Sequence, residues 1–277
     1  MHNTRSLGGM TVSILGCGWL GLGVAKDLIT LGVRVKGSST SAQRLRLLSD
    51  LDIDPYLIQC RRDIEGDRLP DFFNSDVLIV TLPFKRHFNP PSIYVDQMNL
   101  LKTYLQKSPL KMLIFTSSTG IYDGCSGEVN ENTALSLDKP RVAALAQVES
   151  DLMAIDTLDT CILRLAGLYG PDRALGTFWA GKHCPKPANT PVNLLHQADC
   201  IAIIRSCIQQ GCTGIYNAVS DRHPSRQHLY THAALRMGLA PPLFNSTLSD
   251  SLQRQVSNQA LKRCLRYAFL YPDPMGL

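Results

Sequence analysis

The chain has 277 residues, of which 44% are hydrophobic and 18% charged, so it can form one large globular domain with a smaller lobe. Its net charge of +5 is mild, and no dense Lys/Arg cluster with interleaved aromatic residues predicts nucleic-acid binding. No apolar run reaches the roughly 18 residues of a membrane span, and the polar N-terminus lacks the apolar centre of a signal peptide. We therefore expect a cytoplasmic protein with no nucleic-acid or membrane partner, in which residues 1–9 form either a short tail or an upstream start.

Nine cysteines are an odd number without a disulfide framework spacing, which favours a reducing compartment and free thiols. The nearest metal-ligand pairs are His183-Cys184 and His196-x-x-x-Cys200. Neither is accompanied by a Cys-x-x-Cys partner, and Cys200 and Cys207 lie seven residues apart on one face of a predicted helix. We predict buried structural cysteines and no metal site.

The first part of the chain alternates apolar, β-branched segments with segments of helical spacing. Strands are predicted at 11–15, 33–37, 55–60, 75–83 and 111–118. Helices are predicted at 22–32, 41–50 and 91–108. Strands that are apolar along their whole length belong in a parallel sheet covered on both faces. Right-handed crossovers make such a sheet doubly wound, so the predicted fold class is α/β with a doubly wound parallel Rossmann sheet.

The later part continues the alternation and adds an irregular region. After a loop, the pattern predicts a helix, a strand, a helix, a strand and a helix, at 141–154, 160–170, 197–210, 214–219 and 225–239. Residues 171–195 are rich in proline and glycine, and the chain ends in an aromatic, strand-like piece. We expect a Rossmann domain over 10–170 that also receives 192–220, and a small C-terminal substrate lobe from 171–191 and 221–277.

The segment ILGCGWLGLG joins the first strand to the first helix and matches G-x-G-x-x-G. Gly16 permits the tight turn, Gly18 leaves room for a pyrophosphate, and Gly21 lets the helix pack close to the strand. Free N–H groups at the helix N-terminus then attract the diphosphate. The strand–turn–helix context favours a dinucleotide site over a glycine turn without a ligand. The turn and the end of the fourth strand supply the predicted cofactor contacts: Gly16, Gly18, Trp19, Leu20, Gly21, Leu82 and Pro83.

The second strand and the helix after it indicate which cofactor is preferred. An acidic residue about 20 positions past the first glycine would hold the ribose 2′-hydroxyl of NAD. The window VRVKGSSTSAQR contains no Asp or Glu and offers Lys36, Ser38, Ser39, Thr40 and Arg44. Hydroxyls and cations suit the 2′-phosphate of NADP. We predict NADP as the preferred cofactor, with NAD as the alternative if Arg44 is only a surface residue.

Five segments carry a likeness to a known family: GCGWLG, FTSSTGIYD (115–123), LRLAGLYGPDR (163–173), VNLLHQADC (192–200) and IYNAVSDRHPS (215–225). Together they resemble the extended short-chain dehydrogenase/reductases, the NAD(P)-dependent epimerase/dehydratase group, along nearly the whole chain. The resemblance implies a nicotinamide cofactor and a small carbonyl, alcohol or sugar derivative as substrate. It also implies that Ser118 is the family's catalytic serine, and it makes a homodimer an expectation.

The family's Tyr-x-x-x-Lys pair is missing from this sequence. In the family the Tyr transfers a proton at the substrate oxygen, and the Lys lowers the pKa of that Tyr. If Glu149 matches the Glu near the end of the catalytic helix, Arg141 stands where the Tyr belongs and Leu145 where the Lys belongs. This departure, together with the C-terminal FLYPDPMGL, resembles the atypical subgroup of the extended enzymes.

Tyr122 is the other catalytic candidate beside Ser118. It lies at the carboxyl end of a predicted strand, where open α/β sheets bind ligands. Tyr122 is either a surrogate acid assisted by Arg141 or a packed residue with a hydrogen-bonded tip, and the packed role is favoured. Arg164 either pairs with a buried carboxylate or faces the substrate cleft. Asp199 is interpreted as a helix N-cap.

The sequence supports two functions. The intact glycine turn and Ser118 support an NAD(P)-dependent oxidoreductase or epimerase-like enzyme acting on a small carbonyl, alcohol or sugar derivative. The absent Tyr-Lys pair supports a non-catalytic NADP-binding module that senses redox state or regulates. An ionisable group close to the reactive nicotinamide carbon would favour the enzyme.

Overall fold

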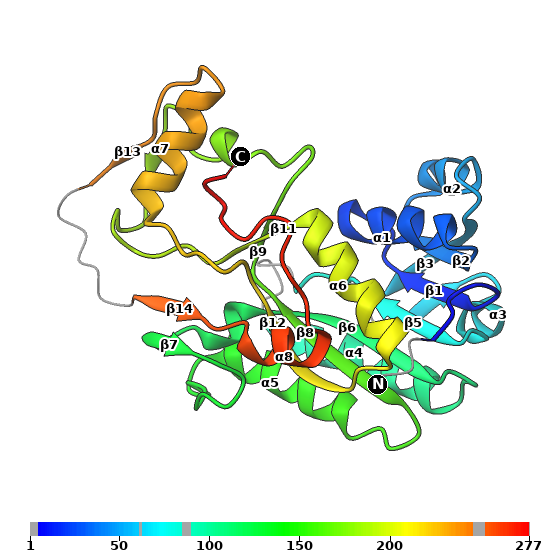
Figure 1. Cartoon of the computed structure of the whole chain (residues 1–277). Coiled ribbons are helices and arrows are strands. Elements are labelled where there is room, and N and C mark those ends of the chain that lie inside the picture. Colours follow the sequence, from blue (N-terminus) through cyan, green and yellow to red (C-terminus); the bar gives the residue numbers. More distant parts are fainter. Residues whose placement is uncertain (1–4, 61–62, 85–89, 246–252, 277) are drawn as a thin grey trace. The chain divides into compact units, whose positions relative to one another are not determined.

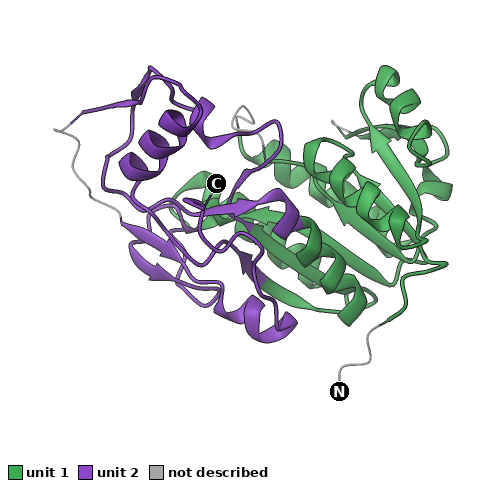
Figure 2. Cartoon of the chain, turned by 45° about the horizontal axis from the view of Figure 1, so that its top comes forward, with its two compact units in different colours: residues 1–121, 137–164, 201–215 green, residues 122–136, 165–200, 216–277 purple. Residues whose placement is uncertain are grey.

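We describe the protein from a computed structural model of its chain (Figure 1). The structure describes residues 5–60, 63–84, 90–245 and 253–276. The chain forms two compact units, which Figure 2 shows in separate colours. Unit 1 comprises residues 1–121, 137–164 and 201–215, and unit 2 comprises residues 122–136, 165–200 and 216–277. Each unit is therefore assembled from segments that lie far apart in the sequence.

A sheet of eight strands forms the centre of unit 1, in the order β12-β8-β6-β5-β1-β2-β3-β4. The strands are β1 (Thr11–Leu15), β2 (Arg34–Ser39), β3 (Asp54–Cys60), β4 (Ile64–Gly66), β5 (Val77–Val80), β6 (Met112–Ser118), β8 (Asp159–Leu165) and β12 (Gly214–Ala218). The pairs β1–β2, β1–β5, β2–β3 and β5–β6 are parallel. The strand order reverses beside β1, which confirms the predicted doubly wound sheet. The antiparallel edge strand β4 was not predicted, because three residues carry no recognisable strand pattern.

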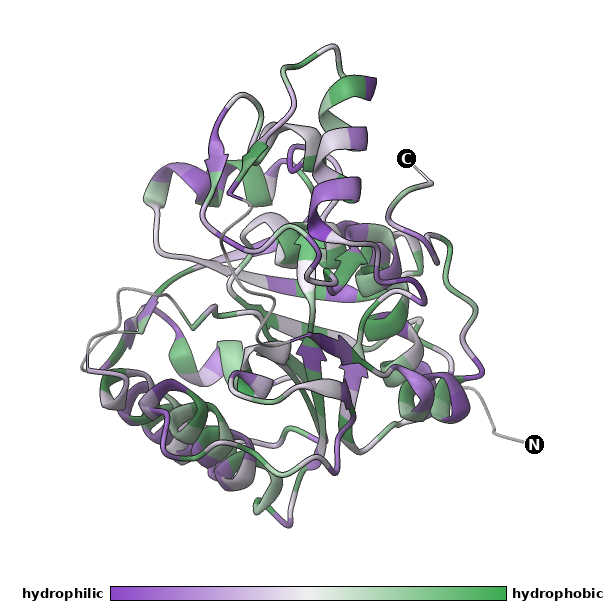
Figure 3. Ribbon diagram, turned by 90° about the vertical axis from the view of Figure 1, so that its left-hand side faces the viewer, coloured by the Kyte–Doolittle hydropathy of each residue, from purple (hydrophilic) through white to green (hydrophobic). Residues whose placement is uncertain are grey.

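Amphipathic helices cover this sheet on both faces. They are α1 (Trp19–Thr30), α2 (Ala42–Ser49), α3 (Leu69–Phe73), α4 (Ser92–Gln106), α5 (Pro140–Met153) and α6 (Gln197–Gln210). In Figure 1, α1 and α6 lie on one face, and α4 and α5 lie on the other. An ion pair of 2.7 Å between Arg205 and Asp27 joins α6 to α1. Figure 3 shows hydrophilic and hydrophobic stretches alternating along the helices, whereas every residue of β5 is buried, as a strand covered on both faces requires.

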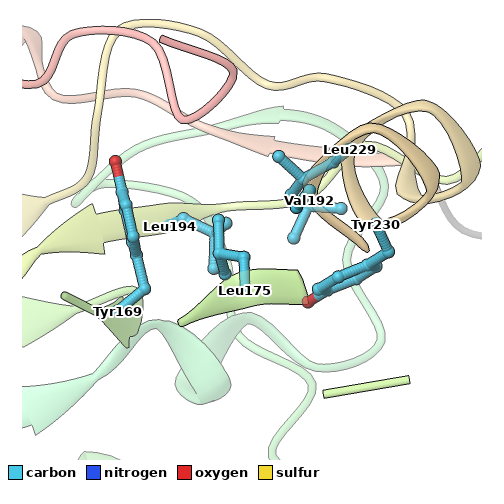
Figure 4. Packing of buried hydrophobic residues seen from close by; sticks show 7 residues of the cluster. Tyr169, Leu175, Val192, Leu194, Leu229 and Tyr230 are labelled. Carbon is cyan, nitrogen blue, oxygen red and sulfur yellow. The ribbon is translucent and has the colours of Figure 1, made fainter. Parts of the chain in front are cut away.

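Unit 2 combines short parallel strand pairs with two helices. β7 (Gly127–Val129) pairs with β14 (Arg254–Val256), β9 (Gly167–Tyr169) with β11 (Leu194–His196), and β10 (His183–Cys184) with β13 (Leu243–Phe244). The helices are α7 (Arg226–Arg236) and α8 (Gln259–Leu265). The apolar core of this unit, shown in Figure 4, is formed by Tyr169, Leu175, Val192, Leu194, Leu229, Tyr230 and Ala233. Segments from three parts of the chain therefore share one core.

The C-terminal segment differs from the predicted strand-like piece, because the aromatic residues after α8 belong to no strand. The buried carboxylate of Asp199 holds them instead. It accepts hydrogen bonds from the hydroxyl of Tyr267 at 2.8 Å and from the backbone N–H groups of Leu270 and Tyr271 at 2.7 and 3.0 Å. Asp199 lies inside the first turn of α6 and not before it, so the predicted N-cap role is wrong. Its carboxylate binds the C-terminal segment instead.

No helix within the described ranges is both long enough and apolar enough to cross a membrane. In the same part of the chain, no three His, Cys, Asp or Glu side chains gather in a way that could hold a metal ion. The nine cysteines are free thiols, and burial raises the pKa of Cys17 to about 12 and that of Cys60 to about 11. These two thiols therefore stay protonated near neutral pH and contribute as packed side chains.

Candidate functional site

The glycine turn between β1 and α1 is fixed by hydrogen bonds around Gly16. This residue has a φ of +105°, a conformation that favours glycine. Its carbonyl oxygen accepts hydrogen bonds from the hydroxyl of Thr81 at 2.6 Å and from the N–H of Gly18 at 2.7 Å. Its own N–H donates to Oγ of Ser38 at 2.8 Å. The ends of β1, β2 and β5 are thus joined at the carboxyl edge of the sheet.

The other two glycines of the motif have opposite surroundings. A Cβ atom at Gly21 would lie 2.3 Å from the carbonyl oxygen of Gly16, so only glycine lets α1 approach the turn this closely. A Cβ atom at Gly18 would meet nothing within 4 Å. Close packing at Gly21 next to open space at Gly18 is the arrangement that a bound pyrophosphate needs.

The N-terminus of α1 begins at this open space. Gly18 is the N-cap residue, makes no side-chain capping bond, and is followed by a first turn without an acidic residue. Trp19 is partly exposed and Leu20 is buried. The backbone N–H groups and the positive end of the helix dipole therefore have no neighbouring carboxylate to repel an anion. The residues present fit a dinucleotide diphosphate.

The three hydroxyls at the end of β2 lie in different surroundings. Ser38 is 2% exposed, and because its Oγ accepts the N–H of Gly16, it supports the turn from within the protein. Oγ of Ser39 accepts the N–H of Ser41 at 3.1 Å. Thr40 is exposed. Of the three, Thr40 has its side chain in solvent, and Ser38 shapes the turn.

Lys36 and Arg44, the two cations predicted to bind the 2′-phosphate, differ in whether their side chains already have partners. The side chain of Arg44 is exposed in the first turn of α2 and makes no hydrogen bond or ion pair with the described residues. Its charge opposes the rise in pKa that burial causes at the thiol of Cys17, a residue of the glycine turn. Lys36 instead donates to the carboxylate and carbonyl of Asp71 and to the carbonyl of Asn74. The ammonium group of Lys36 therefore already binds α3 and its C-cap residue Asn74.

The segment after β5 carries Leu82 and Pro83 and borders the glycine turn. A Cβ atom at Gly16 would lie 3.3 Å from the Leu82 side chain, whereas Pro83 is exposed. Arg141 donates to the carbonyl of Phe84 at 2.7 Å, and its guanidinium lies 4.0 Å from the centroid of the Phe84 ring. Arg141 thus fastens the segment that leaves β5.

Glu149 and Arg164 form a buried ion pair that also binds Ser117, near the end of β6. Arg164 donates to Oε2 of Glu149 from Nε at 3.0 Å and from Nη2 at 2.7 Å, and Ser117 donates to Oε1 at 2.5 Å. Arg164 therefore pairs with a buried carboxylate, which was one of its two predicted roles. Ser118, the next residue, is partly exposed, and its Oγ accepts the N–H of Gly120 at 3.0 Å. Successive strand side chains point in opposite directions, which separates the two serines.

Tyr122 belongs to unit 2 and is fully buried. Its hydroxyl donates to Oδ1 of Asn217 at 2.9 Å, and its carbonyl accepts a hydrogen bond from Arg254. A hydroxyl with a buried amide partner supports the packed role over the surrogate-acid role.

Two tyrosine variants should behave differently. Tyr122→Phe is expected to lower the free energy of unfolding by about 1–2 kcal/mol, because Asn217 loses a buried partner. Tyr169→Phe is the matched control: the hydroxyl of Tyr169 is buried and no described group bonds it, so stability should stay equal or rise. Urea unfolding of both variants measures this. Unchanged stability of Tyr122→Phe with lost turnover would instead support the surrogate acid.

Sequence reasoning missed the residues that hold the site in place. Thr81 ties β5 to the turn, Ser117 binds Glu149, and Phe84 receives Arg141. A polar residue at the carboxyl end of an apolar strand, just after β5 for Thr81 and in the last residues of β6 for Ser117, was the available signal. No local signal points to Phe84, whose partner lies 57 residues away in sequence.

Comparison with known proteins identifies the family. The chain is 32% identical to Protein YeeZ of Escherichia coli strain K12 over 267 residues, which cover 95% of this chain and 97% of that protein. The chain belongs to the YeeZ family. No protein-family profile matches the sequence.

Comparison with solved structures shows the fold of this YeeZ-family chain. A Methylobacillus flagellatus protein, provisionally named an NAD-dependent epimerase/dehydratase, is 25% identical, with a TM-score of 0.77 and coverage of 96% of this chain and 95% of that one. The UDP-glucuronic acid 4-epimerase of Bacillus cereus, solved with NAD, has the same TM-score at 15% identity, with 96% of each chain covered. The fold is that of the extended short-chain dehydrogenase/reductases, as the sequence resemblance implied.

Proposed function

We propose that this protein binds NADP in its glycine turn and catalyses an oxidoreductase or epimerase-like reaction on a small carbonyl or alcohol compound. The observation that carries the proposal is the turn itself, with open space at Gly18 and a closely packed Gly21 at an uncapped helix N-terminus. The NAD-bound epimerase of Bacillus cereus has the same fold, which supports a nicotinamide cofactor. When bound, such a cofactor supplies hydride transfer.

The residues of this chain would hold the cofactor in three places. Backbone N–H groups at Gly18 and the first turn of α1 would receive the diphosphate. Thr40 and Arg44 would receive the 2′-phosphate of NADP, because both side chains are exposed beside the turn and no acidic residue of the window competes. Ser118, partly exposed at the end of β6, would orient a substrate oxygen.

A titration of the purified protein tests this proposal. We expect NADPH to bind more tightly than NADH, as measured by nicotinamide fluorescence. Arg44→Ala should weaken NADPH binding about tenfold and leave NADH unchanged, which is the loss expected for one charge-assisted contact. Arg46→Ala, an exposed arginine on the same helix, is the matched control. Tighter binding of NADH would overturn the NADP assignment, and failure to bind either nucleotide would overturn the whole proposal.

A further inference from the structure

Unit 2 contains a cavity of about 290 Å³ between β9, the turn Leu175–Thr177 and the end of α7. Its walls are largely apolar, with Leu175, Ala233 and Met237 among the lining residues. The volume lies just below the roughly 300–1,000 Å³ that is typical of pockets for drug-sized ligands. The cavity therefore suits one small molecule.

Two glycines allow the walls of this cavity to pack closely against their neighbours. A Cβ atom at Gly176 would lie 2.4 Å from the carbonyl oxygen of Ala233, so the turn packs directly against α7. Gly170 has a φ of +146°, and a Cβ atom there would lie 3.3 Å from Nε2 of His196. A side chain at Gly170 would crowd this nitrogen. The cavity is thus built from positions that require glycine.

His196 lines the cavity with a fixed orientation. Its ring stacks on Tyr271, with 3.6 Å between the ring centroids, and meets Tyr169 edge-on at 5.0 Å. Nδ1 accepts the N–H of Ala198 at 3.2 Å, so the neutral ring carries its hydrogen on Nε2. Burial lowers the pKa of His196, which keeps the ring neutral near pH 7. A ligand next to Gly170 would meet an N–H donor that bonds no other described group.

Arg236 supplies a positive charge to the same cavity. It is the last residue of α7, is exposed, and pairs with no acidic side chain in the described ranges. No Asp or Glu of the described residues lines the cavity. The polar side chains that line the cavity are those of Tyr169, His196 and Arg236, and the N–H donor of His196 and the guanidinium of Arg236 both favour an anion.

We propose that this cavity binds a small organic acid, with its carboxylate at Nε2–H of His196 and the guanidinium of Arg236 and its apolar body against Leu175 and Met237. The inference goes beyond the proposed function, because the cavity lies within unit 2 and its ligand is selected by the side chains of that unit. The hydroxyl of Tyr169 is not assigned to the ligand, since Figure 4 shows it directed away from Leu175.

Ligand-observed NMR on the full chain without cofactor tests the inference. Phenylacetate and hexanoate are the probes, and 2-phenylethanol and 1-hexanol are their uncharged counterparts. We expect the carboxylates to bind at least about tenfold more tightly than the alcohols, and Arg236→Gln to remove that difference. Arg263→Gln, an exposed arginine on α8, is the charge control and should change nothing. His196→Phe keeps a stacking ring and removes the donor, so it should also weaken carboxylate binding.

Equal binding of acids and alcohols would overturn the inference, as would identical titrations of Arg236→Gln and Arg263→Gln. The two proposals fail separately. Carboxylate binding in a protein that binds neither NADPH nor NADH would reject the proposed function. NADPH binding in a protein whose cavity binds acids and alcohols equally would reject the ligand class alone.

Discussion

Glu149→Gln is expected to lower the free energy of unfolding by about 3–5 kcal/mol, which is the largest single effect that the structure predicts for unit 1. The side chains of Glu149 and Arg164 are 3% and 5% exposed and are joined at 2.7 Å. A neutral amide would leave the guanidinium buried without a counter-charge. It would also replace an acceptor of the short hydrogen bond from Ser117 with a weaker one.

Chemical denaturation of the variant and of Glu65→Gln measures this effect. Glu65 is exposed on the edge strand β4, so its change to Gln should alter stability by no more than about 0.5 kcal/mol. The double variant Glu149→Leu/Arg164→Met should recover most of the loss, because apolar side chains of similar size remove both charges together. A loss below about 1 kcal/mol in the single variant would show that the pair is solvated and that its buried placement is wrong.

The ion pair of Glu149 and Arg164 holds the end of β6, where Ser117 is buried and Ser118 is partly exposed. Ser117 is held by a carboxylate that is itself held by Arg164. Ser118 follows it with the opposite side-chain direction and remains partly exposed. The buried network therefore fixes the backbone from which the candidate catalytic serine projects. Substitution of Glu149 should therefore also change the position of Ser118, because the two serines are consecutive in the backbone.

The central sheet and the glycine turn were predictable because their signals are local. Strands such as β5 are apolar along their whole length, and the glycine spacing lies within a single strand–turn–helix unit. Unit 2 was less predictable, since β9 and β11 have three residues each and pair across 27 positions of sequence. Segments that short carry no period, and their pairing depends on a core that forms only when distant segments meet.

Among the site residues, too, those with local signals were predictable and those with long-range partners were not. The glycines need only their neighbours, so their roles follow from spacing. The side chain of Ser38 points into the protein because the register of β2 against β1 places it beneath Gly16, and the sequence does not specify that register. Arg141 was predicted to stand at the family's Tyr position, whereas its partner Phe84 comes from the segment after another strand. Long-range partners decided which of the predicted residues are available to a ligand.

Replacing Gly18 and Gly21 one at a time separates cofactor binding from folding. Gly18→Ala is expected to leave the unfolding midpoint of the cofactor-free protein unchanged, because the new methyl group meets nothing within 4 Å. It should nevertheless weaken NADPH binding at least about tenfold, since the methyl group occupies the space that a pyrophosphate needs. Fluorescence titration and thermal unfolding of the same preparation measure both effects.

Gly21→Ala is the matched comparison, with the same added methyl group three residues along the motif. Here the Cβ would lie 2.3 Å from a backbone oxygen, so α1 must move away from the turn, at a cost of about 1–3 kcal/mol in the free energy of unfolding. Both stability and NADPH affinity should therefore fall. If Gly18→Ala bound NADPH as well as the parent protein does, the space at Gly18 would not be the diphosphate site. The contrast between the two variants attributes the loss at Gly18 to the ligand, because the fold tolerates that methyl group and only the cofactor does not.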